Sequence, residues 1–401
     1  MAQPDEGTPA QKLAPLYGAT FLFGIACGIS LALTPLVLDA AGYDKEQMGT
    51  LALFFAGGLV LLSLPVGAIQ RRFGPKATLT AGLMGYAASV AAFPFVSSYA
   101  GIAAVRFFDG ACSICVWVSS ETLVLSRSDE KHKAHLTSLY AIWLASGYVV
   151  GPLLARFLTQ ILDREQLFVL AGLTAAAAMV QVGRAVRDTS DHDAGRDKAA
   201  TRSELSLGTL LGRIKVSCFA TFSYGYFQSA VVLFLPLYLM ESKGVPADDT
   251  IILPGLFCLG MLLFSNLAGR LADRYGHLFV MLTLALCGMT CIFGFVFLDS
   301  FYLMCGLVLA AGATLAALSP IALALTGVVV PQSEVGRANS LYNTFYASGI
   351  LMGPPMSSLI FARHGGQLML IQLAVLWAAF ITFGIAFGRD DPSWRKRRVT
   401  M

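Results

Sequence analysis

The chain has 401 residues, of which 56% are hydrophobic and only 13% are charged, and its mean hydropathy is +0.68. A soluble protein carries about 25% charged residues, so this composition excludes a soluble globular protein and places most of the chain in lipid. The formal net charge of +4 is therefore no sign of nucleic-acid binding, and we expect no nucleic-acid partner.

Apolar stretches long enough to cross about 30 Å of hydrocarbon, which takes about 20 residues per helix, follow one another along the chain. There are twelve, in chain order: Leu16–Leu38, Gln47–Ile69, Ala77–Phe95, Gly101–Leu125, Leu136–Phe157, Gln166–Val186, Ile214–Leu239, Thr250–Ala268, His277–Leu298, Phe301–Val328, Ala338–Phe361 and Gln367–Phe387. They predict an all-α integral membrane protein with twelve transmembrane helices.

Two sequence patterns occur twice, each time 202 residues apart. Gly67-Ala-Ile-Gln-Arg-Arg-Phe-Gly74 is repeated as Gly269-Arg-Leu-Ala-Asp-Arg-Tyr-Gly276, and the pattern in residues 138–152 is repeated in 340–354. A shared offset predicts two halves of similar fold, which in a membrane protein is typical of a secondary transporter. We expect an N-terminal six-helix half (1–186), a polar cytoplasmic linker (187–209) and a C-terminal six-helix half (210–401).

The Lys and Arg residues in the connections predict the orientation in the membrane. With both termini on one side, that side holds 22 of these residues. The opposite side holds five, namely Lys45, Arg156, Arg164, Lys243 and Arg363. We therefore expect both termini in the cytoplasm and the protein in a bacterial inner membrane.

The repeated glycine-and-basic pattern resembles a family signature. Gly269, Asp273, Arg274 and Gly276 match Gly-x-x-x-Asp-Arg-x-Gly, which resembles the loop signature of the major facilitator superfamily. The number of helices, the linker and the repeat agree with this resemblance over essentially the whole chain. It implies twelve helices in two six-helix repeats.

In that family the loop is a cytoplasmic latch that holds the outward-facing state. The resemblance therefore implies a gating role for the matching residues of both copies: Gly67, Arg72, Gly74, Gly269, Asp273, Arg274 and Gly276. We expect Gly269 to let two helices approach closely, and Asp273 to pair with a basic group or a helix N-terminus. The first copy departs from the signature, because Arg71 stands where the family has Asp.

The stretch Gly101–Leu125 carries almost all the charge within the predicted membrane spans. At 100° per residue one face of this helix holds Arg106, Asp109, Gly110, Ser113, Trp117, Ser120 and Glu121. Ionisable groups in hydrocarbon cost several kcal/mol unless they face a wet cavity or each other. We therefore expect this face to line a central pathway, and Arg106 to pair with Asp109 across one turn.

Arg106 to Gly110 also resembles the family pattern Arg-x-x-Gln-Gly, with Asp109 in place of Gln. In proton-coupled members the Arg of that pattern is linked to proton movement, so the resemblance implies a proton-coupling role for Arg106. Asp109, which pairs with it, and Glu121 are coupling candidates because they are the carboxylates on the same face. Glu121, about 22 Å further along the helix axis, is our candidate proton carrier. Two alternatives stay open: a structural ion pair for Arg106–Asp109, and a solvated residue at the end of the helix for Glu121.

The segment with Gly147, Gly151 and Pro152 partly resembles the family's antiporter signature, Gly-x-x-x-Gly-Pro-x-x-Gly-Gly, without its closing glycines. Small residues and a proline bend would let this helix pivot against a partner, so these three residues are further gating candidates. The match favours export over uptake only slightly, because a copy at Gly349–Pro354 suggests a repeat of the fold.

Aromatic and amide side chains on the helices expected to line the cavity are candidate substrate contacts, because rings with a polar tip suit amphipathic organic molecules. They are Tyr17, Phe21, Trp117, Tyr140, Trp143, Tyr224, Gln228, Asn266, Tyr342, Asn343 and Tyr346. The C-terminal half has no ionisable residue near the middle of a predicted helix, which argues against a polyanionic substrate.

The sequence thus predicts a monomeric secondary active transporter that moves a small organic molecule across the membrane by alternating access, with proton-coupled export as the expected activity. Its expected partners are the substrate, protons and membrane lipid. No enzymatic motif, catalytic residue, cofactor site or metal site is expected. The alternatives are an uncoupled facilitator or importer of a small metabolite, and a membrane scaffold that transports nothing.

Overall fold

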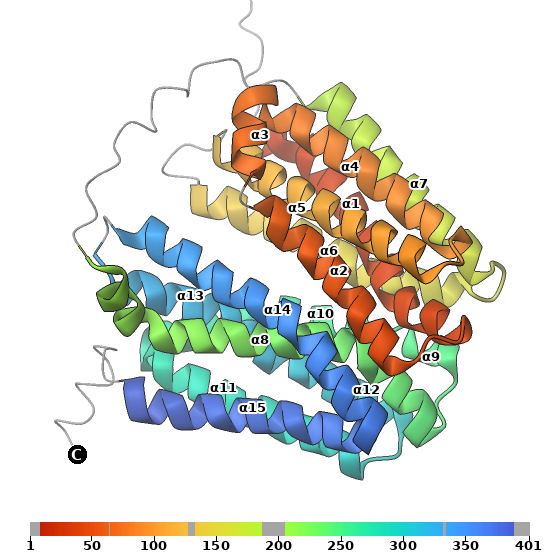
Figure 1. Cartoon of the computed structure of the whole chain (residues 1–401). Coiled ribbons are helices and arrows are strands. Elements are labelled where there is room, and N and C mark those ends of the chain that lie inside the picture. The colour runs from red at the N-terminus through yellow and green to blue at the C-terminus, as the bar shows by residue number, and fades with distance from the viewer. Residues whose placement is uncertain (1–8, 64, 127–132, 187–204, 332–333, 389–401) are drawn as a thin grey trace, which may run out of the picture. The chain divides into compact units, whose positions relative to one another are not determined.

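The structure, a computed structural model, describes residues 9–63, 65–126, 133–186, 205–331 and 334–388 (Figure 1). Twelve helices in these residues are long and apolar enough to cross a membrane. The chain is all-α within the described residues, as predicted. The elements are α1 (Pro9–Ala40), α2 (Lys45–Ser63), α3 (Val66–Phe73), α4 (Pro75–Ala92), η1 (Phe93–Phe95), α5 (Tyr99–Ser126), α6 (Lys133–Leu158), α7 (Arg164–Ala185), α8 (Leu207–Lys243), α9 (Ala247–Thr250), α10 (Leu253–Tyr275), α11 (His277–Phe297), α12 (Phe301–Ala311), η3 (Gly312–Ala316), α13 (Ala317–Val329), α14 (Val335–His364) and α15 (Gly366–Phe387).

Contacts within the chain divide it into two compact units. The first unit comprises Met1–Val37 and Phe54–Arg196, and the second comprises Leu38–Leu53 and Asp197–Met401. The second unit therefore includes the end of α1 and the start of α2, which the predicted halves assign to the N-terminal repeat. The helix α8 begins at Leu207, so the last residues of the predicted linker are helical, whereas 187–204 lie outside the described residues.

Three predicted helices are interrupted. The stretch Gln47–Ile69 is divided at Pro65 into α2 and α3, because proline lacks the N–H group that a helix interior needs. A four-residue helix, α9, precedes α10, in whose first turn Pro254 lies. The stretch Phe301–Val328 contains a π-helical turn, η3, between α12 and α13.

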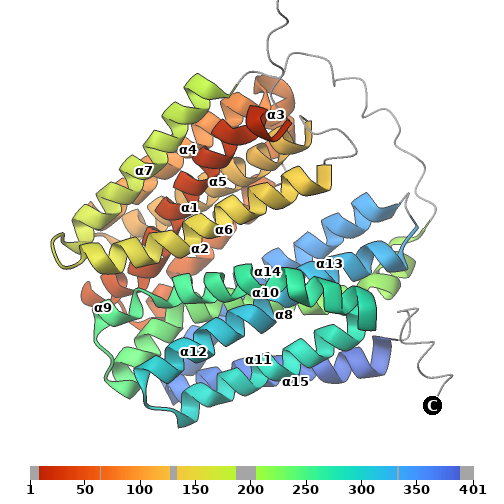
Figure 2. The same cartoon turned by 180° about the vertical axis from the view of Figure 1, so that it is seen from behind.

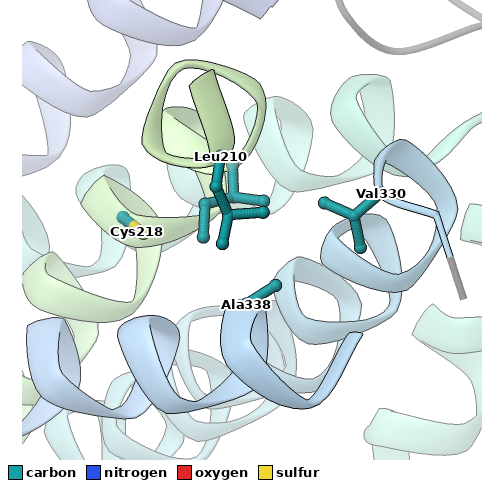
Figure 3. Packing of buried hydrophobic residues seen from close by; sticks show 5 residues of the cluster. Leu210, Cys218, Val330 and Ala338 are labelled. Carbon is teal, nitrogen blue, oxygen red and sulfur yellow. The ribbon is translucent and has the colours of Figure 1, made fainter. Parts of the chain in front are cut away.

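Within the first unit α4 packs on α5 and α7, and within the second α8 packs along α14 while α11 packs on α15 (Figures 1 and 2). Near the start of α8 an apolar cluster joins this helix to the end of α13 and the start of α14 (Figure 3). It consists of Leu210, Ile214, Cys218, Val330 and Ala338. The buried carboxylate of Glu334 accepts a hydrogen bond from the Leu205 N–H at 3.2 Å, so the entry into α8 is held to the second unit.

Candidate transport site

The charged pair on α5 is formed as predicted. Arg106 Nη1 donates to Asp109 Oδ2 at 2.6 Å, and Ser113 Oγ donates to Asp109 Oδ1 at 3.4 Å. Asp109 is only 4% exposed, and Cys27 of α1 and Tyr86 of α4 lie within electrostatic range of it. The carboxylate of Asp109 is thus enclosed by helices of the first unit in this structure, and the expectation that its face of α5 lines a central pathway stays a prediction.

The guanidinium of Arg106 is covered by a ring of another helix. Its central carbon lies 4.5 Å from the centroid of the Phe55 ring on α2. The backbones of α2 and α5 meet on either side of this contact. A Cβ added to Gly110 would collide with the carbonyl oxygen of Phe55, and one added to Gly58 would collide with that of Phe107. Two glycines thus bring the ring within reach of the cation.

The same crossing occurs in the second unit, 202 residues later. A Cβ on Gly260 would collide with the carbonyl oxygen of Leu309, and one on Gly312 with that of Phe257. The positions equivalent to Arg106 and Asp109 are held by Val308 and Ala311. Instead of a charged pair this crossing has a small apolar cavity, lined by Phe257, Val308 and Gln228 among others. The two repeats therefore share the backbone geometry, and only the first carries the charges.

Further along α5, Glu121 is exposed, whereas Ser120 beside it is buried. In the part of the chain that the structure describes, no ion pair involves Glu121; Arg127 lies outside it. The Trp117 Nε1 atom is buried and finds no acceptor among the described residues. The ring of Tyr140 on α6 is also buried, within electrostatic range of Glu121. Of the predicted polar face, the end near Glu121 is thus the accessible part.

The remaining candidates of the first unit lie where α1 meets α6. Tyr17 is buried, and its hydroxyl donates to the Leu136 carbonyl at 3.1 Å. Its polar tip is therefore already bonded within the protein. Phe21 and Trp143 meet edge to face, with centroids 5.7 Å apart, and Trp143 is 42% exposed. Phe21 and Trp143 therefore stay candidates for substrate contact.

In the second unit the structure brings three candidates together. The rings of Tyr224 and Tyr346 are stacked with centroids 5.9 Å apart, and the Tyr346 hydroxyl donates to Gln228 Oε1 at 2.8 Å. Tyr342 is buried within electrostatic range of both rings, and its hydroxyl donates away from them, to the Ser319 carbonyl at 2.8 Å.

Two further candidates of the second unit, Asn266 and Asn343, are exposed, and Asn343 Nδ2 donates to Asn339. The structure does not bring these two amides together with the stacked tyrosines. Their exposure is the one structural observation that keeps them candidates for substrate contact.

Sequence reasoning missed a second polar network, on α8, α14 and α15. Gln372 Nε2 donates to the Tyr226 hydroxyl at 2.6 Å, and Ser357 Oγ donates to Gln372 Oε1 at 3.3 Å. A signal existed, because Gln372 is an amide within the very apolar stretch Gln367–Phe387. Phe55 gave no comparable signal, since a phenylalanine in an apolar helix is the ordinary case.

The glycines of the predicted pivot on α6 pack against α1. A Cβ on Gly151 would lie 2.5 Å from the Ile25 carbonyl oxygen, one on Gly147 would collide with that of Phe21, and Pro152 packs on Gly28. The counterpart of Gly151 in the second unit, Gly353 on α14, packs in the same way against α8. In both units this glycine pattern therefore lets two helices pack closely, α6 on α1 and α14 on α8.

The gating signature is helical and not a loop. Gly67 and Arg72 lie on α3, and Gly269, Asp273 and Arg274 lie on the last turns of α10. Gly74 and Gly276 end these helices with φ of 84° and 96°, a conformation that side chains with a Cβ rarely adopt.

Asp273 has a histidine beside it, and the contact is an ion pair only when that imidazole is protonated. The Asp273 carboxylate lies 3.7 Å from His277 Nε2 at the start of α11. Arg274 and Arg72 each lie over the ring of the next residue, Tyr275 and Phe73. A Cβ on Gly269 would meet nothing within 4 Å, so the close helix approach expected at Gly269 is not present in this structure.

Sequence reasoning also missed an ion-pair cluster around the connection of α1 and α2. Lys45 Nζ lies 3.3 Å from Asp39 Oδ1, forms an ion pair with Glu241 at the end of α8, and is 5.7 Å from the centroid of the Phe361 ring on α14. Arg363 Nε lies 3.8 Å from Glu46 Oε1. These contacts hold the segment Leu38–Leu53 within the second unit.

Comparison with known proteins identifies the family. The sequence profile of the Major Facilitator Superfamily matches residues 16–299 and 217–400. The chain belongs to the Major Facilitator Superfamily. It is therefore a transporter of a small molecule, an integral membrane protein and not an enzyme.

Relatives of this superfamily transporter include YfkF of Bacillus subtilis (strain 168), an uncharacterized MFS-type transporter 24% identical over 334 residues, or 82% of this chain and 84% of the relative. YcaD of Escherichia fergusonii, another uncharacterized MFS-type transporter, is 22% identical over 90% of this chain and 91% of its own length.

Among solved structures, the nucleoside transporter NupG matches with a TM-score of 0.76 and 12% identity over 96% of this chain and 100% of that one. A D-xylose–proton symporter matches with a TM-score of 0.73 and 16% identity, covering 94% of this chain and 97% of that one. At these identities both structures support the superfamily fold.

Proposed function

We propose that this superfamily member couples the movement of a small, uncharged organic molecule to the movement of protons and acts as an exporter by alternating access. The observation that carries the proposal is the asymmetry of the two repeats. One helix crossing holds the buried pair Arg106–Asp109, and the equivalent crossing holds Val308 and Ala311. An ion pair within a membrane span is costly, so its presence in one repeat favours a role in function.

Two carboxylates on α5 have different roles in this proposal. Asp109 is buried and paired with Arg106, so it acts as the gate-side group, which exchanges a proton only when the pair separates. Glu121 is exposed and lies within electrostatic range of Tyr140, so it acts as the proton carrier. Both roles follow the rule that ionisable groups within membrane spans mark ion and proton pathways, whether buried or facing a wet cavity.

The proposed substrate site in the second unit is neutral. Tyr346 and Gln228, which are half-buried, offer a ring face, a phenol and an amide, and the buried ring of Tyr224 backs that of Tyr346. These groups suit an uncharged molecule with a planar or ring-shaped part and several hydrogen-bonding groups. Nucleosides and pentoses, the molecules named for NupG and the D-xylose symporter, are therefore the first compounds to test.

The direction and the setting are part of the same proposal. Export rests on the partial antiporter signature at Gly147, Gly151 and Pro152, and proton-coupled uptake or uncoupled facilitation is the alternative. The proposed setting is a bacterial inner membrane, with the protein a monomer in contact with lipid and both termini cytoplasmic, because basic residues gather on that side of the predicted topology.

The test is proton-driven transport in proteoliposomes. Purified protein is reconstituted with a pH-sensitive dye inside, a panel of nucleosides, pentoses and uncharged amphipathic molecules is applied, and proton flux is followed with substrate added to either side. Substrate-dependent proton flux that disappears in Asp109→Asn and Glu121→Gln, and survives in the exposed control Glu165→Gln, would support coupling through α5. If the double variant Asp109→Asn with Glu121→Gln still concentrates substrate against its gradient when a pH gradient is imposed, coupling through α5 is wrong.

A further inference from the structure

The contact between Arg106 and the Phe55 ring is the starting point. The guanidinium carbon lies 4.5 Å from the ring centroid, within the range of about 6 Å over which a cation is attracted to the face of an aromatic ring. The Arg106 side chain is 13% exposed, so little water surrounds it. A cation–π contact gains strength when the cation is desolvated in this way.

The position of the ring relative to Arg106 is fixed by the helix crossing. Phe55 presents its carbonyl oxygen to Gly110, one turn beyond Arg106 on the same helix. Three residues after Phe55 on α2, Gly58 receives the carbonyl oxygen of Phe107. Because both contacts are made by backbone atoms, the Cα atom from which the ring extends keeps its position along α5 unless the two helices move relative to each other.

The structure assigns Phe55 as a positioning residue for the charged pair: its ring holds the guanidinium of Arg106 in the orientation that meets Asp109. This assignment rests on the proposed proton coupling. It adds that a displacement of α2 relative to α5 disturbs the Arg106–Asp109 pair, since Phe55 and the two glycines link the helices at this point. Phe55 itself touches neither proton nor substrate.

The second repeat provides the internal control. Phe257 has the position of Phe55 at the equivalent crossing, with its carbonyl oxygen against Gly312. Among the described residues no cation lies over it, since Val308 stands where the first repeat has Arg106, and the Phe257 ring lies 6.3 Å from that of Phe227 between centroids. A change at Phe257 therefore measures what the ring contributes to packing, and the same change at Phe55 measures packing together with the cation.

The experiment weakens the negative potential on the face of the ring while keeping the shape of the ring nearly unchanged. Trifluorophenylalanine, in which fluorine weakens the negative face of the ring, is incorporated by stop-codon suppression at position 55 or, as the control, at position 257. Phe55→Leu, Phe257→Leu and Phe55→Tyr complete the set. For each protein the melting temperature in detergent, the maximal transport rate and its pH profile are measured in proteoliposomes.

A measured pH dependence of transport could come from any of several titratable groups, because more than one of them lies near Asp109. They are Arg106 and Cys112 on α5, Cys27 on α1 and Tyr86 on α4. Infrared difference spectra over a pH titration, with Asp109→Asn as the reference, isolate the Asp109 carboxyl band. This readout does not depend on transport.

Trifluorophenylalanine at position 55 is expected to lower the maximal rate about fivefold and to shift the Asp109 titration by roughly half a pH unit. At position 257 it should do neither, and Phe55→Tyr should stay near the wild-type rate. Equal effects at positions 55 and 257, or no shift of the Asp109 band in the position-55 protein, would overturn the assignment. If Asp109→Asn retains proton-driven transport, the proposed coupling fails, and the infrared shift still decides the role of Phe55.

Discussion

Gly24 on α1 and Gly225 on α8 make the same contact in the two units. A Cβ on Gly24 would lie 2.6 Å from the carbonyl oxygen of Leu144, and one on Gly225 would collide with that of Tyr346. Leu144 and Tyr346 are 202 residues apart, whereas the two glycines are 201 residues apart. The repeat therefore preserves a backbone-to-backbone helix contact across a one-residue difference in spacing.

The first prediction concerns two other glycines of the same helix interfaces, α1 with α6 and α8 with α14. Gly151→Ala and Gly353→Ala each place a Cβ 2.5 Å from a carbonyl oxygen of the facing helix, so each should destabilise the protein by about 1–3 kcal/mol. Gly306→Ala on α12 is the control, because its Cβ would meet nothing within 4 Å, and it should be neutral or slightly stabilising. Thermal unfolding in detergent measures all three. Equal stability of the three variants would contradict the tight contact.

A second prediction concerns Glu121. Glu121→Gln should abolish transport driven by a pH gradient and leave substrate exchange at equal pH largely intact, because exchange needs no net proton movement. The comparison of gradient-driven uptake with exchange of labelled substrate in proteoliposomes checks it. Loss of both activities, with substrate binding also lost, would instead place Glu121 at the substrate site.

The third prediction concerns the cluster around Lys45. Lys45→Met removes the cation from Asp39, Glu241 and the Phe361 ring, and it should weaken the attachment of Leu38–Leu53 to the second unit. A double-mutant cycle of Lys45→Met with Glu241→Gln should give a coupling of about 1 kcal/mol in detergent melting. The matched control is Lys243→Met with Asp299→Asn, a pair whose carboxylate is 86% exposed and whose coupling should be near zero. Similar coupling energies in the two cycles would show that the Lys45–Glu241 ion pair contributes no more than an exposed ion pair does.

Asp273 carries the fourth prediction. Its carboxylate lies 3.7 Å from His277 Nε2, and Asp273→Asn removes the charge that the family signature uses as a latch. The population should then shift towards the inward-facing state, since a contact that favours one state has been lost. Spin-label distances between α3 and α10 should lengthen. Unchanged distance distributions would contradict a gating role for Asp273.

The fifth prediction is topological. Single cysteines at Asp163, before α7, and at Asp248, in α9, should be labelled by a membrane-impermeant thiol reagent applied outside intact cells. A cysteine at Gly208 should be labelled only after permeabilisation, since basic residues gather on its side. The eight native cysteines are first replaced by serine or alanine. Labelling of the Asp163 or Asp248 position only from the cytoplasmic side would reverse the orientation.

The sequence was sufficient for the number of helices, the family and the Arg106–Asp109 contact, because hydropathy, repeats and an i,i+3 spacing are local properties of the chain. It was not sufficient for the neighbours of those residues. Phe55 is about fifty residues from Arg106, and Lys45 is about two hundred from Glu241, and no periodicity connects either pair. The burial of Asp109 was missed for the same reason, since a helical wheel shows a face and not what covers it.

The breaks in the helices were missed for a different reason. A hydropathy window averages over about 19 residues, so Pro65 and the π-turn at Gly312–Ala316 do not interrupt the signal. The charged ends Gln70–Phe73 and Gly269–Tyr275 lowered the same average and were left outside the predicted helices. Their helical form follows from the terminal glycines Gly74 and Gly276, whose positive φ ends each helix at the last residue of the signature.

The helix α2 belongs to both units, because Lys45–Leu53 packs with the second and Phe54–Ser63 with the first. Its two ends are therefore held by different forces: ion pairs of Lys45 and Glu46 hold the first turn within the second unit, and the close backbone approach at Gly58 holds the other end against α5 in the first. Added salt should weaken the first of these attachments and leave the second unchanged.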